Sequence, residues 1–118
     1  MGGVMSSWSI IYNPNCSKSR KALQILREHK INPTIIDYLQ NPLSREQLSD
    51  IADKIGVEAH QLLRKKEKAF VEANIDVTND MNVFDAMVDN PSLIERPIVV
   101  HKEKALIARP PEKLLDII

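Results

Sequence analysis

The chain has 118 residues, enough for one globular domain with its own core, and 43% of them are hydrophobic. Its 16 Lys and Arg residues balance 16 Asp and Glu residues, so the zero formal charge excludes a broadly basic surface that binds nucleic acid. A single cysteine excludes a disulfide framework and a cysteine-rich metal site, and it indicates a reducing, cytoplasmic location.

Two further classes are excluded by the pattern of residues. No apolar stretch approaches the ~20 residues that span a bilayer, so we expect no membrane association. The three histidines, which lie far apart in the chain, show no spacing typical of metal ligands, so we expect no metal site: they are His29, His60 and His101.

The first part of the chain predicts a strand, a helix and a second strand. Residues 9–12 are apolar and partly β-branched, as in a buried strand, and residues 1–8 before them are expected to form a flexible leader. Apolar residues then recur at helical spacing until Pro33, and residues 34–38 predict the second strand. A strand, a helix and a strand within ~30 residues form a βαβ unit, so the two strands should be parallel.

The second part predicts a helical block followed by a hairpin. Ser44 and Gln47 match a capping box, and Gly56 is placed to end that helix. Further helices are predicted at 59–63, at 66–73, and from about 79 to 89. Residues 98–100 and 105–108 predict an antiparallel hairpin, and Pro111 opens a final amphipathic helix. Together the elements predict an α/β sandwich of four strands flanked by helices, in one domain over residues 9–118.

The cysteine lies where a thiol is easily ionised. Cys16 belongs to a polar loop that precedes a helix, where unpaired N–H groups and the helix dipole favour a thiolate. Lys18 and Arg20 add positive charge in the first turn. The pattern Cys-x-x-Ser, completed by Ser19, excludes an internal disulfide. The alternative interpretation is a small buried side chain with no reactivity.

Three arginines occupy the ends of predicted elements. Arg96 precedes Pro97 and a strand, and Arg109 ends the antiparallel partner of that strand, so both should lie at the same edge of the sheet, which the end of the first strand can also reach. Arg64 ends an apolar helix. Guanidinium groups suit tetrahedral oxyanions because they donate paired hydrogen bonds and stay charged. The alternative interpretation is that the three arginines form ordinary ion pairs at the protein surface.

Four motifs in this order resemble the glutaredoxin-coupled arsenate reductases. They are Asn-Pro-Asn-Cys-Ser-Lys-Ser-Arg at 13–20, Leu-Leu-Arg-Lys at 62–65, Glu-Arg-Pro-Ile-Val-Val at 95–100, and Ala-Arg-Pro-Pro-Glu at 108–112. The resemblance implies a thioredoxin-like fold with a four-stranded mixed sheet and a helical insertion between strands 2 and 3. It also implies a cis peptide bond before Pro97.

The same resemblance implies roles for single residues and molecules. Cys16 would be the nucleophile, and Arg64, Arg96 and Arg109 would bind the oxyanion. Arsenate would be the substrate, glutathione the co-substrate and glutaredoxin the partner, with no bound cofactor and a monomeric chain. Tyr12 stands where many members carry a histidine, and a tyrosine cannot depress the thiol pKa as a protonated imidazole does.

Two other functions remain open on the sequence. A redox-responsive transcriptional regulator that binds RNA polymerase would keep a cysteine loop at this place, but related regulators lack the Ala-Arg-Pro-Pro motif, so Arg109 favours the enzyme. A thiol–glutathione exchange protein would use Cys-x-x-Ser and would not need the arginines.

Overall fold

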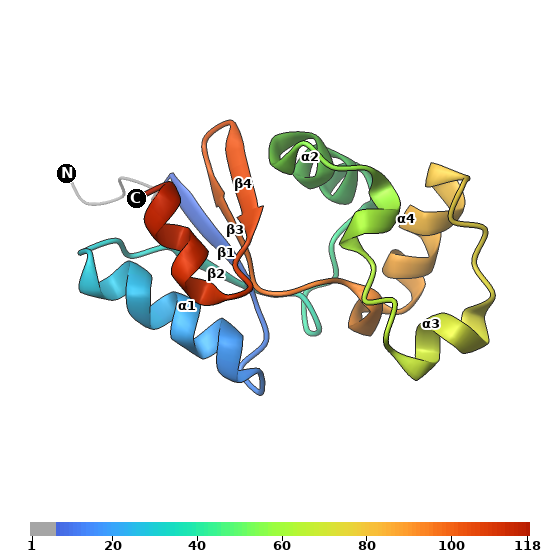
Figure 1. Ribbon diagram of the computed structural model, residues 1–118, viewed down its shortest axis with the longest axis horizontal. Helices are drawn as coiled ribbons and strands as arrows, with labels where there is room; N and C mark the ends of the chain where they lie inside the picture. Colours follow the sequence, from blue (N-terminus) through green and yellow to red (C-terminus); the bar gives the residue numbers. More distant parts are fainter. Residues whose placement is uncertain (1–6) are drawn as a thin grey trace. The chain divides into compact units, whose positions relative to one another are not determined.

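The computed structural model describes residues 7–118, which form two compact units. The sheet unit holds the described chain up to Asp37 together with residues 96–118, and the helical unit is residues 38–95. Figure 1 shows the elements of both in chain order. Most of the expected leader, residues 1–6, lies outside the described residues, and Trp8 already belongs to the first strand.

The sheet unit is built on a mixed sheet of four strands in the order β2-β1-β3-β4. The strands are β1 (Trp8–Tyr12), β2 (Thr34–Asp37), β3 (Ile98–His101) and β4 (Lys104–Ile107). Strand β1 pairs in parallel with β2 and antiparallel with β3, and β3 pairs antiparallel with β4. The predicted βαβ unit and the predicted hairpin are therefore both confirmed.

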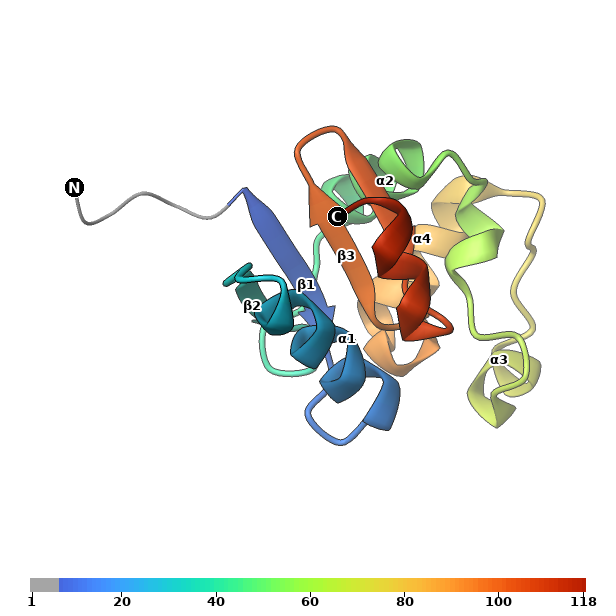
Figure 2. The same cartoon turned by 60° about the vertical axis from the view of Figure 1, so that its left-hand side comes forward.

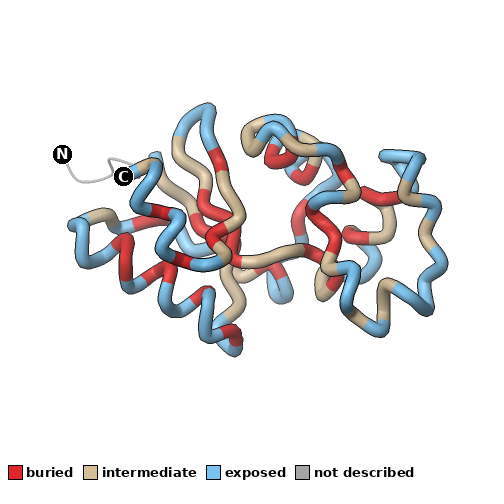
Figure 3. Tube along the Cα trace, in the orientation of Figure 1, coloured by how far each residue is buried: buried red, intermediate tan, exposed pale blue. Residues whose placement is uncertain are grey.

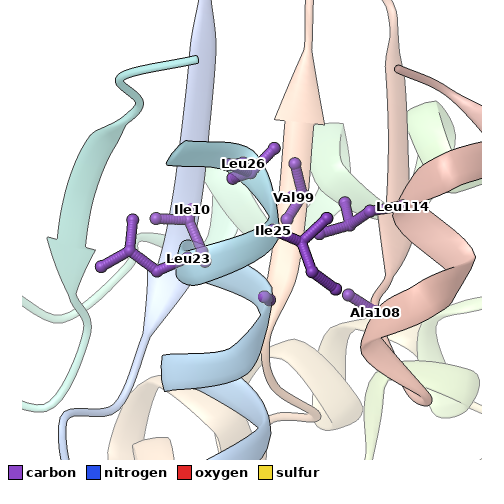
Figure 4. Packing of buried hydrophobic residues seen from close by; sticks show 8 residues of the cluster. Ile10, Leu23, Ile25, Leu26, Val99, Ala108 and Leu114 are labelled. Carbon is purple, nitrogen blue, oxygen red and sulfur yellow. The ribbon is translucent and has the colours of Figure 1, made fainter. Parts of the chain in front are cut away.

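Helix α1 (Ser17–Glu28) and the 3-10 helix η3 (Pro111–Asp116) pack against each other on one face of the sheet (Figures 1 and 2). Buried residues recur at intervals along α1 (Figure 3). The resulting core joins both helices to the two central strands (Figure 4), and its buried members are Ile10, Ala22, Leu23, Ile25, Leu26, Val99, Ala108 and Leu114. This packing fixes the direction of α1 and so the position of the loop before it.

The helical unit is the insertion between β2 and β3 that the resemblance implies. Its elements are α2 (Arg45–Ile55), η1 (Ala59–Leu62), α3 (Lys68–Ala73), α4 (Asp80–Asp89) and η2 (Pro91–Leu93). The predicted capping box is present at the start of α2, where Ser44 and Gln47 bond each other's backbone N–H groups. Gly56 ends α2 in the left-handed conformation at φ +83°, as predicted.

Two predicted helices differ in type from the expectation. The segment predicted at 59–63 and the C-terminal segment that begins at Pro111 are 3-10 helices, η1 and η3. The four residues of η1 are a usual length for a 3-10 helix, whereas η3, with six residues, is longer than most. The fold is the α/β arrangement of four strands and flanking helices that the element order predicts, and it agrees with the thioredoxin-like fold that the resemblance implies. Among residues 7–118, no helix is both long and apolar enough to cross a membrane.

Candidate active site

The cysteine loop is a tight turn between β1 and α1. The N–H of Cys16 donates to the carbonyl oxygen of Asn13 at 2.9 Å, and the N–H of Asn15 donates to the Asn13 side chain at 2.9 Å. Cys16 is the N-cap of α1, with extended backbone, and its carbonyl oxygen accepts the first helical hydrogen bond from the Arg20 N–H at 3.1 Å. The sulfur therefore occupies the position from which an N-cap side chain normally accepts helix N–H groups.

The environment of Cys16 lowers the pKa of its thiol. Burial raises this pKa, because only 9% of the residue is exposed and a buried charge is poorly solvated. The backbone N–H and hydroxyl of Ser19, the backbone N–H of Lys18 and the charge of Arg96 outweigh burial and bring the pKa below its ordinary value. The Cys16 side chain makes no capping hydrogen bond.

Ser19 links the thiol to the preceding loop. It is fully buried, and its hydroxyl oxygen accepts a hydrogen bond from the Asn13 N–H at 3.3 Å. The same hydroxyl stabilises the Cys16 thiolate. A hydroxyl has one donor and two acceptor sites, so both interactions can exist together. From the sequence, Ser19 was expected only to rule out an internal disulfide, and no role at the thiol was predicted for it. Its spacing three residues after the N-cap was the available signal, since a side chain there reaches back to the cap.

Arg96 supplies the positive charge beside the sulfur. Its charge lowers the Cys16 pKa, although the two residues lie 80 positions apart in the sequence. Its Nε and Nη1 atoms are buried and have no hydrogen-bond partner among the described residues. Buried N–H groups of a charged side chain are costly when unpaired, so they point to a ligand with oxygen acceptors.

Arg109 lies at the same edge of the sheet as Arg96, as predicted. Its Nη1 donates to the carbonyl oxygen of Arg96 at 3.0 Å, and the next backbone bond runs from the Ala108 N–H to the Pro97 oxygen at 2.9 Å. The Arg96–Pro97 peptide bond is cis, as the resemblance implies. The Arg109–Pro110 bond is cis as well, which no pattern in the sequence predicted.

Lys18 and Arg20, which were predicted to bring positive charge to Cys16, do not do so through their side chains. The Arg20 side chain turns to the loop, where its Nη1 donates to the Pro14 carbonyl oxygen at 2.9 Å. Lys18 influences Cys16 through its backbone N–H. The cation that lowers the thiol pKa is Arg96, so the prediction of positive charge was correct but its assignment to Arg20 was wrong. Helical spacing does not fix where the end of a long side chain lies, because contacts in the folded chain determine its direction.

Arg64 belongs to the helical unit and is held there by its own partners. Its guanidinium forms ion pairs with Glu67 and, at 3.9 Å, with Glu95, and Nη1 donates to the Ser92 carbonyl oxygen at 3.4 Å. Its backbone N–H donates to Leu93 at 2.7 Å, which anchors the chain at this residue. A role for Arg64 in oxyanion binding stays a prediction.

The three histidines take part in unrelated local contacts. His29 bonds the Ile25 carbonyl oxygen of its own helix end at 2.9 Å, and His60 pairs with Glu58 at 3.0 Å. His101 stacks on Trp8 with ring centroids 4.0 Å apart. Within residues 7–118, no group of three or more His, Cys, Asp or Glu side chains could hold a metal ion.

The site is thus a thiol of lowered pKa at a helix N-terminus, beside a guanidinium whose Nε and Nη1 atoms are buried without partners, on a thioredoxin-like fold. This is the arrangement of a thiol-based oxyanion site. Residues 11–117 match the sequence profile of the ArsC family, and the chain belongs to that family.

Known relatives cover nearly the whole chain. An arsenate reductase of Haemophilus influenzae is 40% identical over 92% of this chain and 97% of its own. YfgD of Escherichia coli K12, whose name describes it as uncharacterized, is 42% identical over 92% of this chain and 94% of its own. The solved structure of an arsenate reductase from Vibrio cholerae is 39% identical, superposes with a TM-score of 0.91, and covers 97% of this chain and 99% of its own.

Proposed function

We propose that this protein reduces arsenate to arsenite, with Cys16 as the nucleophile and glutathione and glutaredoxin as the external reducing system. The observation that carries the proposal is the pairing of a Cys16 thiol of lowered pKa with buried, unpaired N–H groups on Arg96. A lowered pKa supplies the thiolate that a nucleophile needs near neutral pH. The unpaired N–H groups can donate hydrogen bonds to the oxygens of a tetrahedral oxyanion. The arsenate reductases among the relatives support the choice of anion.

The charge of the sheet unit supports anion binding in spite of the neutral chain. The described residues of this unit contain ten Lys and Arg against five Asp and Glu, a formal net charge of +5. The helical unit carries the opposite balance, so the whole chain sums to zero. A local positive field raises the concentration of anions near a site and speeds their association.

In the first step, the Cys16 thiolate attacks arsenic. Arsenate is held by the guanidinium groups of Arg96 and Arg109 near the helix N-terminus, with Arg64 as the third arginine that the family resemblance implies. A sulfur–arsenic bond forms, and one arsenate hydroxyl group takes up a proton and leaves as water as its bond to arsenic breaks. Arsenic remains in the +5 state in this adduct.

In the second step, the thiolate of glutathione attacks the Cys16 sulfur. The sulfur–arsenic bond breaks and its electron pair passes to arsenic, so arsenic is reduced by two electrons and leaves as arsenite. The two sulfurs are oxidised to a mixed disulfide between Cys16 and glutathione. Because the chain has no second cysteine, an external thiol must resolve this disulfide, which is the role we assign to glutaredoxin in a cytoplasmic thiol pool.

A coupled assay tests the proposal directly. The purified protein is supplied with arsenate, glutathione and glutaredoxin, and arsenite is measured. We expect turnover by the wild type and none by Cys16→Ser, whose hydroxyl is a far weaker nucleophile at neutral pH. Arsenite formation by the mutant would overturn the assignment of Cys16. A folded wild type that is inactive here and captures RNA polymerase would support a regulator, and one that reduces only glutathione mixed disulfides would support an exchange protein.

A further inference from the structure

A shallow groove of about 450 Å³ runs along α1, entirely within the sheet unit. We call it the α1 groove. One wall comes from the end of β1 and the other from the exposed side of α1, and its lining residues are Tyr12, Arg20, Leu23, Gln24, Arg27 and Glu28. Its volume lies within the usual range for sites that bind small molecules. None of these residues takes part in the chemistry at Cys16 described above.

The groove begins beside the cysteine loop, at Tyr12 and Arg20. Cys16, Arg20 and Arg27 follow one another at spacings of four and seven residues, which places them on one stripe of α1. Helical side chains lean toward the helix N-terminus, so long ones cover the turn before their own position. Arg20 shows this directly, because its guanidinium reaches the Pro14 carbonyl oxygen at 2.9 Å. The far end of Arg27 should likewise lie toward the thiol.

The charges in the groove suit one class of ligand. Arg20 and Arg27 offer two guanidinium groups for two carboxylates. Near them, the Glu28 carboxylate accepts a hydrogen bond from the Gln24 amide at 3.3 Å, and this carboxylate can also bind an ammonium group. Leu23 gives the groove an apolar base. A small thiol with two carboxylates and one ammonium group is complementary to this set.

We propose that the α1 groove is the glutathione site, an inference that rests on the use of glutathione in the proposed function. Arg20 and Arg27 are seven residues apart, which is ~10.5 Å along a helix. A three-residue peptide spans at most ~10–11 Å when extended. The two carboxylates of glutathione can therefore contact the two guanidinium groups. Because both side chains lean back toward the helix N-terminus, the central residue of glutathione lies ~5 Å along the helix from Cys16, within the Cα–Cα range of a disulfide.

Glutathionylation of Cys16 tests the groove without arsenate. The Cys16 thiolate attacks oxidised glutathione, a sulfur–sulfur bond forms to one half and breaks to the other, and reduced glutathione leaves. Mass spectrometry follows the mixed disulfide. The same reaction with hydroxyethyl disulfide, which has no carboxylate or ammonium group, reports the intrinsic reactivity of the thiol. The ratio of the two rates measures recognition of glutathione alone.

Arg27→Gln is the informative variant, since Arg27 is exposed and has no part in the chemistry proposed at Cys16. We expect it to slow the reaction with oxidised glutathione about tenfold, the loss of one charge-assisted contact, and to leave the rate with hydroxyethyl disulfide unchanged. Lys21→Gln removes an exposed charge from the same helix outside the groove and should change neither rate. Arg20→Gln should resemble Arg27→Gln in the rate ratio.

The outcomes separate this inference from the proposed function. An unchanged rate ratio in Arg27→Gln, or an equal loss in Lys21→Gln, would overturn the groove as the glutathione site, whatever the arsenate assay gives. In a protein that does reduce arsenate, Arg27→Gln should also raise the KM for glutathione about tenfold and leave the KM for arsenate unchanged. A rise in the KM for arsenate alone would show that the groove serves the oxyanion and would overturn the inference.

Discussion

The Arg109 guanidinium donates a hydrogen bond from Nη1 to the backbone carbonyl oxygen of Arg96, at 3.0 Å. One strand-end arginine is therefore held by the backbone of the other, and the two charges occupy the same edge of the sheet. They differ in their relation to the thiol, because the charge of Arg96 lowers the Cys16 pKa and its Nε and Nη1 are buried without partners. This difference allows the two arginines to be separated by experiment.

Arg96→Gln should impair both the thiol and the oxyanion site. We expect kcat/KM for arsenate to fall roughly 10–100-fold, the usual loss for one charge-assisted contact in a partly buried site. The Cys16 pKa should also rise, because a cation that favours the thiolate is gone. The pH dependence of alkylation by iodoacetamide reports this, and the curve should move to higher pH. Lys102→Gln, which removes an exposed charge from the β3–β4 turn, should leave both measurements unchanged.

Arg109→Lys should impair the oxyanion site alone. A lysine keeps the charge but cannot hold the Arg96 backbone and an oxyanion through one planar group. We expect the KM for arsenate to rise roughly tenfold. The alkylation curve should stay where it is in the wild type, and a shift of that curve would show that Arg109 also acts on the thiol.

Ser19→Ala should raise the pKa of Cys16. The variant lacks the hydroxyl that stabilises the thiolate, and the Asn13 N–H loses its acceptor. Because the pKa is lowered in the folded wild type, the wild-type thiol ionises at lower pH than the variant, and the variant should need a higher pH to reach the same alkylation rate. Ser17→Ala, an exposed change in the same helical turn, is the matched control. Equal curves for wild type and Ser19→Ala would show that the hydroxyl has no such role.

Local patterns predicted much of this fold, and they did so where the cause is local. The capping box at Ser44 and the left-handed end of α2 at Gly56 depend on a few neighbouring residues, so the sequence shows them directly. Strand pairing followed from chain order, since a short βαβ segment allows little except a parallel pair. The same reasoning placed Arg96 and Arg109 at one edge of the sheet.

The directions of long side chains could not be predicted from such local patterns. Arg20 lies one turn from Cys16, but its guanidinium bonds Pro14, and the effective cation comes from Arg96 on a distant strand end. Long side chains have many rotamers, and tertiary contacts choose among them. The missing partners of the Arg96 Nε and Nη1 atoms could likewise be recognised only with the surrounding atoms in place.

Leu114→Ala should destabilise the protein far more than the same change at its neighbour. Leu114 is fully buried in the core between η3, α1 and the sheet, whereas Leu115 is 55% exposed. We expect Leu114→Ala to lower the free energy of unfolding by about 2–5 kcal/mol, through lost burial and the cavity left behind. Leu115→Ala should change it by less than ~0.5 kcal/mol. Urea unfolding of both variants makes the comparison, and similar losses would contradict this packing of η3.

Gly56→Ala tests whether the end of α2 is limited by backbone conformation or by space. At φ +83°, Gly56 is left-handed, and a side chain there would meet nothing within 4 Å. Any loss must therefore come from the conformation, which costs residues with a Cβ about 1–2 kcal/mol. Asparagine tolerates this region better, so Gly56→Asn should lose clearly less than Gly56→Ala in urea unfolding. Equal losses in the two variants would show that the left-handed backbone is not what selects glycine, because the steric environment of the two side chains near their Cβ is the same.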